Sequence, residues 1–371
     1  MLFSLEALRA KHGDSLILHF GDAADPTFFV IDGGPKTIWD GALKPRLEKL
    51  RTRFGDEDER LQIPMAMVSH VDQDHVYGMM QMFGHMQQRG PNNPYRVQQL
   101  WLNSFKSIVG TDTIPASVQE RHSKAPTQKS RPVVASVGEA SKLTERAQGI
   151  GVPINPGFPG IVAAPAQRTI AGLQLTILGP SEDLVENLRV QWAKEIQAPG
   201  VVPASYLDDW AFNLSSIVVI ARWQGKTMLL TGDARGDHIL DALKAAGILK
   251  TNAPAHFDLL KVPHHGADND VTTDFFRKVT ADHYVFSGNG DHGNPDSSTL
   301  FMLAEARDEP GDRRPYDVWF TYRTGSHQLN KRLRAFEKFQ SDAGRPMTTH
   351  YATTSGKKSL IVNLGDETVT W

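Results

Sequence analysis

Two imidazoles and two carboxylates lie within the six residues 70–75, just after the apolar run Met65–Val68, as His70, Asp72, Asp74 and His75. Imidazole nitrogen and carboxylate oxygen are ligands that borderline divalent metals accept together. In an extended segment, residues two apart point to the same side, so His70 and Asp72 form one pair. Asp74 and His75 form a second pair where a helical pattern begins. The spacing predicts ligands for two divalent ions, and an ordinary polar turn is the alternative.

Three later apolar runs also end in side chains that bind metals. Asp233 follows "MLLTG", His264 and His265 follow "LLKVP", and His292 and Asn294 follow "HYVFSG" within "SGNGDHGNPD". The ends of neighbouring strands lie close together in a sandwich of sheets, so these groups are expected to converge. Each signal alone is weak, because Asp233, for example, also suits the N-cap of the helix that follows it.

The apolar runs are short and bounded by Gly, Asp or Pro, which is typical of strands, and longer helical patterns lie between them. This mixture indicates stacked sheets flanked by helices. The predicted strands are 15–20, 27–32, 64–69, 173–178, 215–222, 227–232, 257–262, 283–288, 317–322 and 359–364. The predicted helices are 42–54, 75–88, 138–148, 235–248, 297–306 and 328–340.

Composition narrows the class of protein. A chain of 371 residues with 40% hydrophobic and 22% charged residues has enough apolar sequence for a sizeable core, and a net charge of −2 gives no global attraction to nucleic acid or membrane. The absence of cysteine excludes disulfides, thiolate metal sites and a cysteine nucleophile. No apolar run approaches the roughly 20 residues that span a bilayer, so no membrane insertion is expected, and a cytoplasmic location is the prediction.

One domain over 1–371 is predicted, with a loop-rich insertion at about 89–168 and a C-terminal extension after about 305. The insertion is rich in Gly, Pro, Gln and Ser. It also carries a basic stretch that could hold a phosphate backbone, with a solvated loop as the equal alternative. The basic residues are Arg121, Lys124, Lys129 and Arg131.

The stretch "SHVDQDHVYG" resembles the H-x-H-x-D-H motif of the metallo-β-lactamase fold, with Asp72 in place of the second histidine. This H-x-D-x-D-H variant is similar to the soluble hydrolase domain of the competence DNA-uptake channel. The stretches "KHGDSLILHF", "FFVIDGG", "LQLTILGPS", "FNLSSIVVIARWQGKTMLLTGDA" and "LLKVPHHGAD" resemble other segments of that family, in its order. The resemblance covers most of 1–305, skips the insertion, and implies an α/β fold: an αββα sandwich of two mixed sheets flanked by helices.

The resemblance also implies roles for the cluster. His70 and Asp72 would ligate one of two divalent ions per chain, Asp74 and His75 would ligate the other, and Asp233 would bridge them. These assignments describe a dinuclear metal-dependent hydrolase.

Further roles follow from the same resemblance. His264 or His265 would lie at the metals or act on the leaving group, and Asp32 would orient the ligand loop. Two positions depart from the family pattern. Asn213 stands where many relatives carry a third histidine, and Asn294 stands at a late histidine position unless His292 substitutes for it. A site with fewer imidazoles would favour Mn²⁺ or Mg²⁺, with Zn²⁺ as the alternative.

The predicted reaction is hydrolysis of a phosphodiester or nucleic acid by a metal-activated water, since "G-x-S-x-G" is absent from the chain. Asp74, His264 and His265 are the candidate catalytic residues. Lys261 joins them as a point charge for a phosphate, or is a strand-edge lysine. The alternatives are a small-molecule esterase or lactamase-like hydrolase, and a metal-binding sensor or interaction module with weakened catalysis. The sequence does not identify a protein partner.

Overall fold

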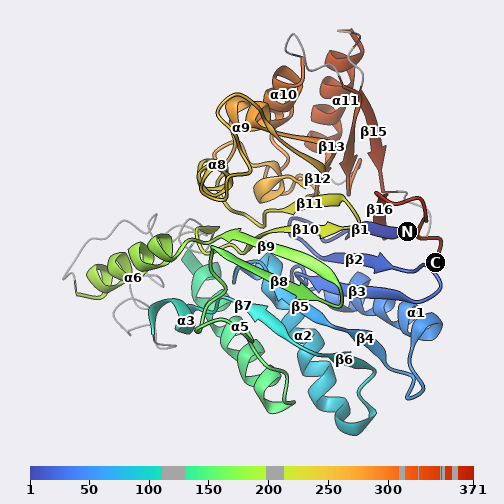
Figure 1. Cartoon of the computed structure of the whole chain (residues 1–371), viewed down its shortest axis with the longest axis vertical. Coiled ribbons are helices and arrows are strands. Elements are labelled where there is room, and N and C mark those ends of the chain that lie inside the picture. Colours follow the sequence, from blue (N-terminus) through green and yellow to red (C-terminus); the bar gives the residue numbers. More distant parts are fainter. Residues whose placement is uncertain are drawn as a thin grey trace.

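The computed structural model describes residues 1–110, 130–197, 213–308, 314–324, 326–342, 344, 347–352 and 358–371. Two β-sheets pack face to face, and helices cover the outer face of each (Figure 1). The predicted αββα sandwich of two mixed sheets is therefore confirmed.

The first sheet has six strands, antiparallel from β16 to β3 and parallel from β3 to β7. The parallel half ends where β5 runs into the predicted ligand loop. In spatial order the strands are β16 (Ser359–Asn363), β1 (Leu2–Leu8), β2 (Leu16–Gly21), β3 (Pro26–Ile31), β5 (Met65–Val68) and β7 (Leu100–Leu102). A separate parallel pair joins β4 (Leu61–Ile63) to β6 (Tyr95–Val97).

The second sheet has eight strands, parallel from β15 to β11 and antiparallel from β11 to β8. Parallel neighbours end at the same edge of a sheet, so the loops after β11, β12 and β13 come together. In spatial order the strands are β15 (Met347–Tyr351), β14 (Tyr316–Phe320), β13 (Val279–Phe286), β12 (Ala255–Lys261), β11 (Lys226–Leu230), β10 (Val218–Trp223), β9 (Leu173–Gly179) and β8 (Ala166–Ile170).

Alternating side chains on the strands supply separate apolar cores. On β3, Phe28 and Val30 pack toward the helices, whereas Phe29 and Ile31 pack between the sheets. The helices on the first sheet are α1 (Lys44–Phe54), which follows the π-helical turn η1 (Trp39–Leu43), α2 (Gln73–Arg89) and α5 (Ser130–Gly149). Those on the second sheet are α8 (Gly236–Ala245), α9 (Thr273–Lys278), α10 (Ser297–Ala306) and α11 (His327–Asp342). The short α3 (Phe105–Val109) lies against α6 (Glu182–Gln197) at one end of the sandwich.

The predicted strands and helices all occur, with shifted ends. Strand β1 was not predicted because Glu6 interrupts its apolar run, yet Glu6 is buried. The segment predicted to be loop-rich contains the 20-residue helix α5, which packs on α2, and β7, which joins the first sheet. The residues after 305 also add to the sandwich: β14 and β15 extend the second sheet, and β16 pairs with β1.

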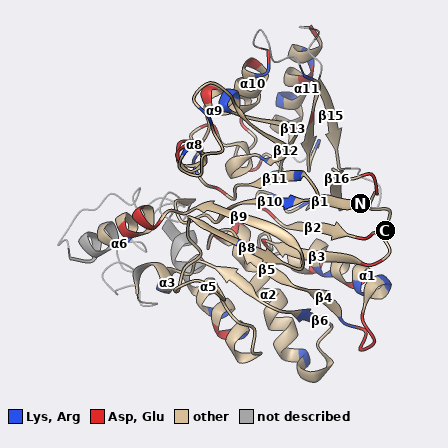
Figure 2. Ribbon diagram, in the orientation of Figure 1, with Lys and Arg blue, Asp and Glu red and all other residues tan. Residues whose placement is uncertain are grey.

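Charged residues of both signs are interspersed along the outer helices (Figure 2). Within the described ranges, no helix has the length and apolar character needed to cross a bilayer.

Candidate metal centre

Loops from both sheets meet at one edge of the sandwich and bring the predicted ligands together. His70 comes from the β5–α2 connection of the first sheet, and Asp74 and His75 come from the first turn of α2. Asp233 follows β11 and His265 follows β12 in the second sheet. The centre is therefore assembled from two layers, with Asp233 on one side and the histidine-rich loop of the first sheet on the other.

Glycines allow α2 to sit directly against the end of β3. The Gly33 amide donates to the His75 carbonyl at 2.7 Å, and the Gly78 amide donates to the Gly34 carbonyl at 2.9 Å. A Cβ on Gly78 would lie 2.0 Å from the Gly33 carbonyl oxygen, which is far inside van der Waals contact. The "DGG" and "VYG" segments thus fix where the first turn of α2, and with it His75, can lie.

Four imidazoles surround the buried carboxylate of Asp233. The Nε2 atoms lie 3.4 Å (His75), 3.5 Å (His265), 3.6 Å (His264) and 3.8 Å (His70) from its Oδ2. The Asp74 carboxylate lies 3.6 Å from the His265 Nε2 and 3.9 Å from that of His75. These distances are too long for strong hydrogen bonds and leave room for a cation between the groups.

The other nitrogen of each ring has a partner on its far side. The Nδ1 of His75 lies 2.9 Å from an Asp32 oxygen, and that of His264 lies 2.6 Å from an Asp270 oxygen. The Nδ1 of His265 lies 2.7 Å from the Ser287 hydroxyl, and that of His70 lies 3.2 Å from the Ser69 hydroxyl. A partner at Nδ1 turns Nε2 toward the cluster, as at metal-ligating histidines.

Asp32 lies behind the ligand loop, where it was expected to act. Its two oxygens accept hydrogen bonds from the Ser69 amide and hydroxyl, both at 2.7 Å. Through the same carboxylate it contacts His75. Asp32 has a φ of 56°, a left-handed conformation that is uncommon outside glycine, Asn and Asp. The carboxylate therefore ties the loop and the imidazole to one point.

The histidine pair after β12 has an unusual backbone. His264 and His265 have φ of 46° and 54°, and Gly266 follows with φ of 89°. Left-handed conformations cost about 1–2 kcal/mol for an ordinary residue. The His264 amide donates to the Gly232 carbonyl at 3.2 Å, which helps to hold this turn beside Asp233. Such strain, held by surrounding contacts, is common at functional sites.

The donor set fits a divalent metal. The Nε2 atoms of His70, His75 and His265 and the Oδ1 of Asp233 are buried and have no hydrogen-bond partner. Leaving several polar atoms unpaired at one buried point is costly unless a cation or ordered water pairs with them. Ligand atoms of Asp14, His75, Asp233 and His265 all lie within 4.8 Å of one another, in a buried group able to hold a metal ion. Imidazoles and carboxylates contribute about equally, a mixture that suits Zn²⁺ as well as Mn²⁺.

Burial and charge act together on the protons of the cluster. Burial would raise the pKa of Asp233, but the surrounding rings of His265 and His75 outweigh it and hold that pKa well below its usual range. Burial opposes protonation of His75 and His265, yet Asp233 raises the pKa of both well above the usual value. Burial, together with the neighbouring His75, lowers the pKa of His70 to about 3. His70 is thus neutral, the form in which imidazole ligates a metal.

Lys261 is placed differently from its expected role. Its side chain is 1% exposed, and Nζ lies 2.8 Å from an oxygen of Asp14, which is equally buried. Asp14 in turn lies 3.5 Å from the Nδ1 of His265. Burial would raise the pKa of Asp14, but Lys261 and then His265 lower it far more. The ammonium group neutralises a carboxylate behind His265, and its burial argues against contact with a phosphate.

Three other predicted residues lie at the margin of the cluster. The Asn213 side-chain nitrogen is 3.4 Å from the His264 Nδ1, so this position does lie beside the centre. Asp72 is the N-cap of α2 and is not in the four-residue group, so ligation by Asp72 stays a prediction. His292 is exposed and packs edge-on against the ring of His12, with the centroids 4.5 Å apart.

Asn294 and the basic stretch complete the predicted residues. The Asn294 amide donates to the His264 carbonyl at 3.2 Å and so supports the histidine turn. Arg121, Lys124 and Lys129 lie outside the described residues, as does the side chain of Arg131. Their part in substrate binding stays a prediction.

Sequence reasoning missed Asp14, Asp270, Ser69 and Ser287. Each contacts a histidine of the cluster from a distant or unremarkable position. A signal was present for Asp14, which lies in "KHGDSLILHF", one of the stretches that resemble the family. In the structure a Cβ on the neighbouring Gly13 would lie 2.0 Å from the Asp74 carbonyl oxygen, so this segment packs closely against the ligand loop. The others had no distinguishing pattern.

Comparison with known proteins adds limited information. No family model matches the chain. A 72-residue segment, 19% of the chain, is 36% identical to microtubule-associated protein 1A of Homo sapiens and spans 2% of that protein. Among solved structures, a mutant of the CmlA beta-hydroxylase has a TM-score of 0.39 at 11% identity, covering 98% of this chain and 54% of that one. A beta-lactamase domain protein from Burkholderia ambifaria has a TM-score of 0.33 at 14% identity, covering 89% and 82%. At these scores the sandwich architecture rests on the strands described above.

Proposed function

We propose that the protein is a metal-dependent hydrolase. The observation that carries the proposal is the convergence of unpaired Nε2 atoms of buried histidines on Asp233, while every Nδ1 is held from behind. His70, His75 and His265 would hold the metal together with Asp74 and Asp233. Divalent ions bound there would lower the pKa of water and neutralise the negative charge that develops during hydrolysis.

The exposed side of the centre indicates where a substrate approaches. The side chains of Asp74 and His264 are 22% and 25% exposed, whereas those of His70, His75, Asp233 and His265 are 3% exposed or less. A substrate would therefore reach the centre between Asp74 and His264.

The two histidines of the turn would divide their roles. His265 is buried between Asp74 and Asp233 and suits ligation. His264 is partly exposed, its Nε2 lies 3.6 Å from an oxygen of Asp233, and Asp270 holds its Nδ1 at 2.6 Å. Burial would lower the pKa of His264, but Asp233 and Asp270 raise it. His264 is thus the residue suited to deliver a proton from Nε2 to a leaving oxygen.

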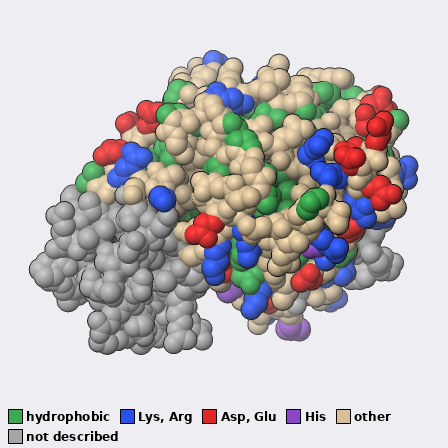
Figure 3. Space-filling view, turned by 90° about the horizontal axis from the view of Figure 1, so that it is seen from below, with side chains coloured by type: hydrophobic (Ala, Val, Ile, Leu, Met, Phe, Trp, Pro, Cys, Tyr) green, Lys and Arg blue, Asp and Glu red, His purple; other side chains and the backbone are tan. Residues whose placement is uncertain are grey.

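Phosphodiesters, including nucleic acid, are the first candidate substrates, on the resemblance to the competence-channel hydrolase domain. The described surface gives little further support for nucleic acid. Basic and acidic side chains are intermixed on the face seen from below (Figure 3). Lys261 is buried, and the basic stretch of the insertion lies outside the described residues.

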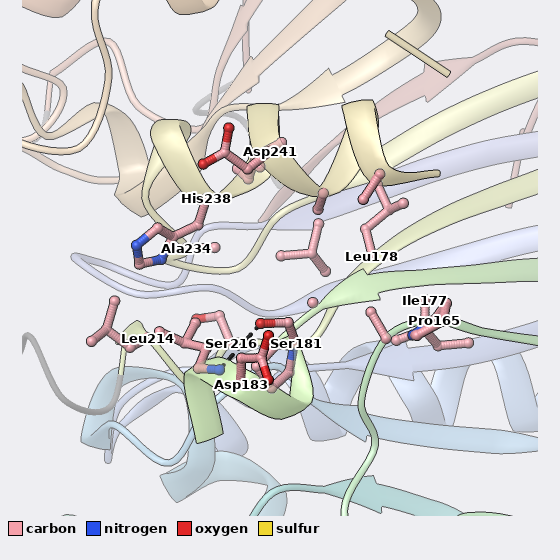
Figure 4. A pocket seen from close by; sticks show the side chains of 18 of the residues that line it. Pro165, Ile177, Leu178, Ser181, Asp183, Leu214, Ser216, Ala234, His238 and Asp241 are labelled. Atoms are coloured by element: carbon pink, nitrogen blue, oxygen red, sulfur yellow. Dashed lines mark hydrogen bonds between the residues drawn. The ribbon is translucent and has the colours of Figure 1, made fainter. Parts of the chain in front are cut away.

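An uncharged ester or amide is the second candidate. The specific observation is a largely aliphatic cavity that is lined by residues next to the metal centre (Figure 4). Phosphodiesters carry a negative charge, and this cavity has two carboxylates in its lining. The cavity therefore favours a neutral substrate.

The test combines metal content with turnover. Protein loaded with Mn²⁺, Mg²⁺ or Zn²⁺ is checked by elemental analysis and assayed on single-stranded DNA, RNA, bis-p-nitrophenyl phosphate and p-nitrophenyl butyrate. Metal-dependent turnover of a diester supports the first candidate, and turnover of the carboxylic ester alone supports the second. A metal-loaded protein that turns over none of the four would overturn the hydrolase proposal in favour of a metal-binding sensor.

A further inference from the structure

A cavity of about 480 Å³ opens beside the metal centre, in the size range of small-molecule sites. It lies between α8 on one side and the segment that leads into α6 on the other, with the end of β9 at its inner wall (Figure 4). In Figure 4, His238 and Asp241 come from α8, and Ser181 and Asp183 face them from the α6 side.

Three lining residues belong equally to the surroundings of the metal centre. Ser216 accepts a hydrogen bond from the Asp233 amide at 3.3 Å, and Ala234 is the next residue in the chain. Asn213 lies 3.4 Å from the Nδ1 of His264. A molecule seated in the cavity therefore has one end beside the residues that contact Asp233 and His264, which themselves lie outside the lining.

The walls are aliphatic over most of their area. They include Ile177, Leu178, Pro180, Leu214, Val218 and Ile239. Among the described lining residues the ionisable side chains are Asp183, His238 and Asp241, and no lysine or arginine is present. Asp183 and Asp241 are exposed at the rim, so the charge of the cavity repels an anion.

One lining residue carries a buried polar atom without a partner. Asn213 is 4% exposed, and its Oδ1 has no hydrogen-bond partner. A buried acceptor without a partner is costly, so a ligand that offers an N–H or O–H group here gains a hydrogen bond. The cavity thus combines apolar walls with one acceptor close to the metal centre, which is typical of small-molecule sites.

We infer that this cavity binds the uncharged apolar group of the substrate, an aliphatic acyl ester or amide whose carbonyl end extends from the cavity toward the metal centre. The inference rests on the proposed hydrolase function. In the reaction, the oxygen of water bonds to the carbonyl carbon and the bond from that carbon to the leaving oxygen or nitrogen breaks. A proton passes to the leaving atom, and the products are a carboxylic acid and an alcohol or amine.

The kinetic test uses p-nitrophenyl acetate, butyrate and octanoate with the metal-loaded protein. Each buried methylene contributes about 0.8 kcal/mol, close to fourfold, so kcat/KM for octanoate should exceed that for butyrate by at least about tenfold. Ala242→Phe should fill the cavity and bring the ratio of octanoate to acetate near one. Ala245→Phe, at an exposed lining position, is the second variant should the first fail to fold.

The matched control is Lys244→Phe, which adds the same ring on the same helix at an exposed position outside the lining. It removes only an exposed ion pair with Asp241, which contributes little. The chain-length ratio should keep its wild-type value in this variant. Equal losses in Ala242→Phe and Lys244→Phe would overturn the inference.

The binding test does not depend on turnover. Calorimetry with 1-octanol and octanoate, on protein with and without chelator, should show octanol binding in both states. In chelator, octanoate should bind at least tenfold more weakly than octanol. Ala242→Phe should abolish octanol binding, and Lys244→Phe should retain it. Octanol should also bind better than its methyl ether, and Asn213→Ala should remove that preference.

The two proposals can fail separately. The wild-type protein could bind octanol, lose that binding in Ala242→Phe, and yet hydrolyse no ester or diester. This result would support ligand binding in the cavity and overturn the proposed hydrolase function. Ester hydrolysis that ignores chain length, without octanol binding, would support the hydrolase and overturn the cavity.

Discussion

Glu6 and Asp233 are both buried carboxylates that contact histidine, and their surroundings differ. Glu6, under α1, accepts hydrogen bonds from the Arg46 Nε at its two oxygens, at 2.8 and 2.9 Å. The Ser359 hydroxyl donates to it at 2.6 Å, and the His19 Nε2 lies 2.9 Å from it. Both of its oxygens are paired. Asp233 has four imidazoles at 3.4–3.8 Å, and its Oδ1 has no hydrogen-bond partner.

The difference separates a structural cluster from one suited to a ligand. At Glu6 the guanidinium supplies the positive charge and hydrogen-bond distances are normal, so both carboxylate oxygens are paired within the protein. The Nδ1 of His19 and the Nη2 of Arg46 are unpaired there, but another nitrogen of each residue pairs with Glu6. Around Asp233 the unpaired atoms belong to several residues and face one another. Histidine beside a carboxylate is therefore a weak signal, whereas convergence of unpaired atoms is a strong one.

The largest expected effect is at Asp233. In Asp233→Ala, metal content measured by elemental analysis should fall to background, because this carboxylate faces every imidazole of the cluster. Metal-dependent turnover should fall with it. His70→Ala should lower occupancy only in part. Full metal occupancy in Asp233→Ala would show that the Asp233 carboxylate is not needed to hold the metal.

At Glu6 the expected effect is on stability. Glu6→Ala leaves the Arg46 charge buried without its partner, and breaking such a pair costs about 3–5 kcal/mol. The free energy of unfolding, measured with urea, should fall by that amount, while metal per folded molecule stays at the wild-type value. Metal loss from folded Glu6→Ala would show that the two clusters are coupled.

A smaller effect is expected behind the cluster. Asp270→Asn weakens the support of the His264 Nδ1 without touching Asp233. Removing such a partner typically lowers metal affinity or activity about 10–100-fold. Turnover should fall within that range, and metal titration should show how much of the loss is affinity. Asp268→Asn, two residues away, is the control and should behave as wild type. The Asp268 carboxylate accepts a hydrogen bond from the Ser298 hydroxyl, and the Asp268 amide donates to the Asp296 carboxylate.

The smallest effect concerns Glu139, a buried carboxylate that has no ion-pair partner within 4 Å among the described residues. Glu139 on α5 is 8% exposed, its Oε1 accepts from Gln73 at 3.1 Å, and its Oε2 is unpaired. Burial raises its pKa to about 7 from an ordinary value of 4.5. The folded protein then holds a proton that the unfolded chain has lost, so this residue reduces stability as pH rises from about 4.5 to 7.

Glu139→Gln should remove this dependence. The variant should gain stability relative to wild type at pH 8, and the two should be nearly equal at pH 4.5, as read from urea unfolding at each pH. A constant difference across that range would mean that Glu139 keeps its charge when folded. Its burial would then resemble that of Glu6, with a partner for the charge.

Local patterns in the sequence were enough for most strands and helices, because the alternation of apolar residues and the spacing of helical faces are set within a few residues. The ligand pairs His70–Asp72 and Asp74–His75 were visible for the same reason. Strand β1 was missed because its buried Glu6 depends on Arg46, a partner on another element, which no local pattern shows. Helix α5 was predicted only in part, at 138–148 within a span expected to be loop-rich.

Only the tertiary structure decided which polar groups meet. The sequence predicted Lys261 as an accessible cation or a strand-edge lysine. The fold buries it against Asp14, a residue far from it in the sequence. Asp270 became the partner of His264 through a strained turn, and Asn213 came to line a cavity as well as the metal centre. A side chain's charge and chemistry are properties of the residue, but its solvation and partners depend on chain segments that are brought together only when both sheets have packed.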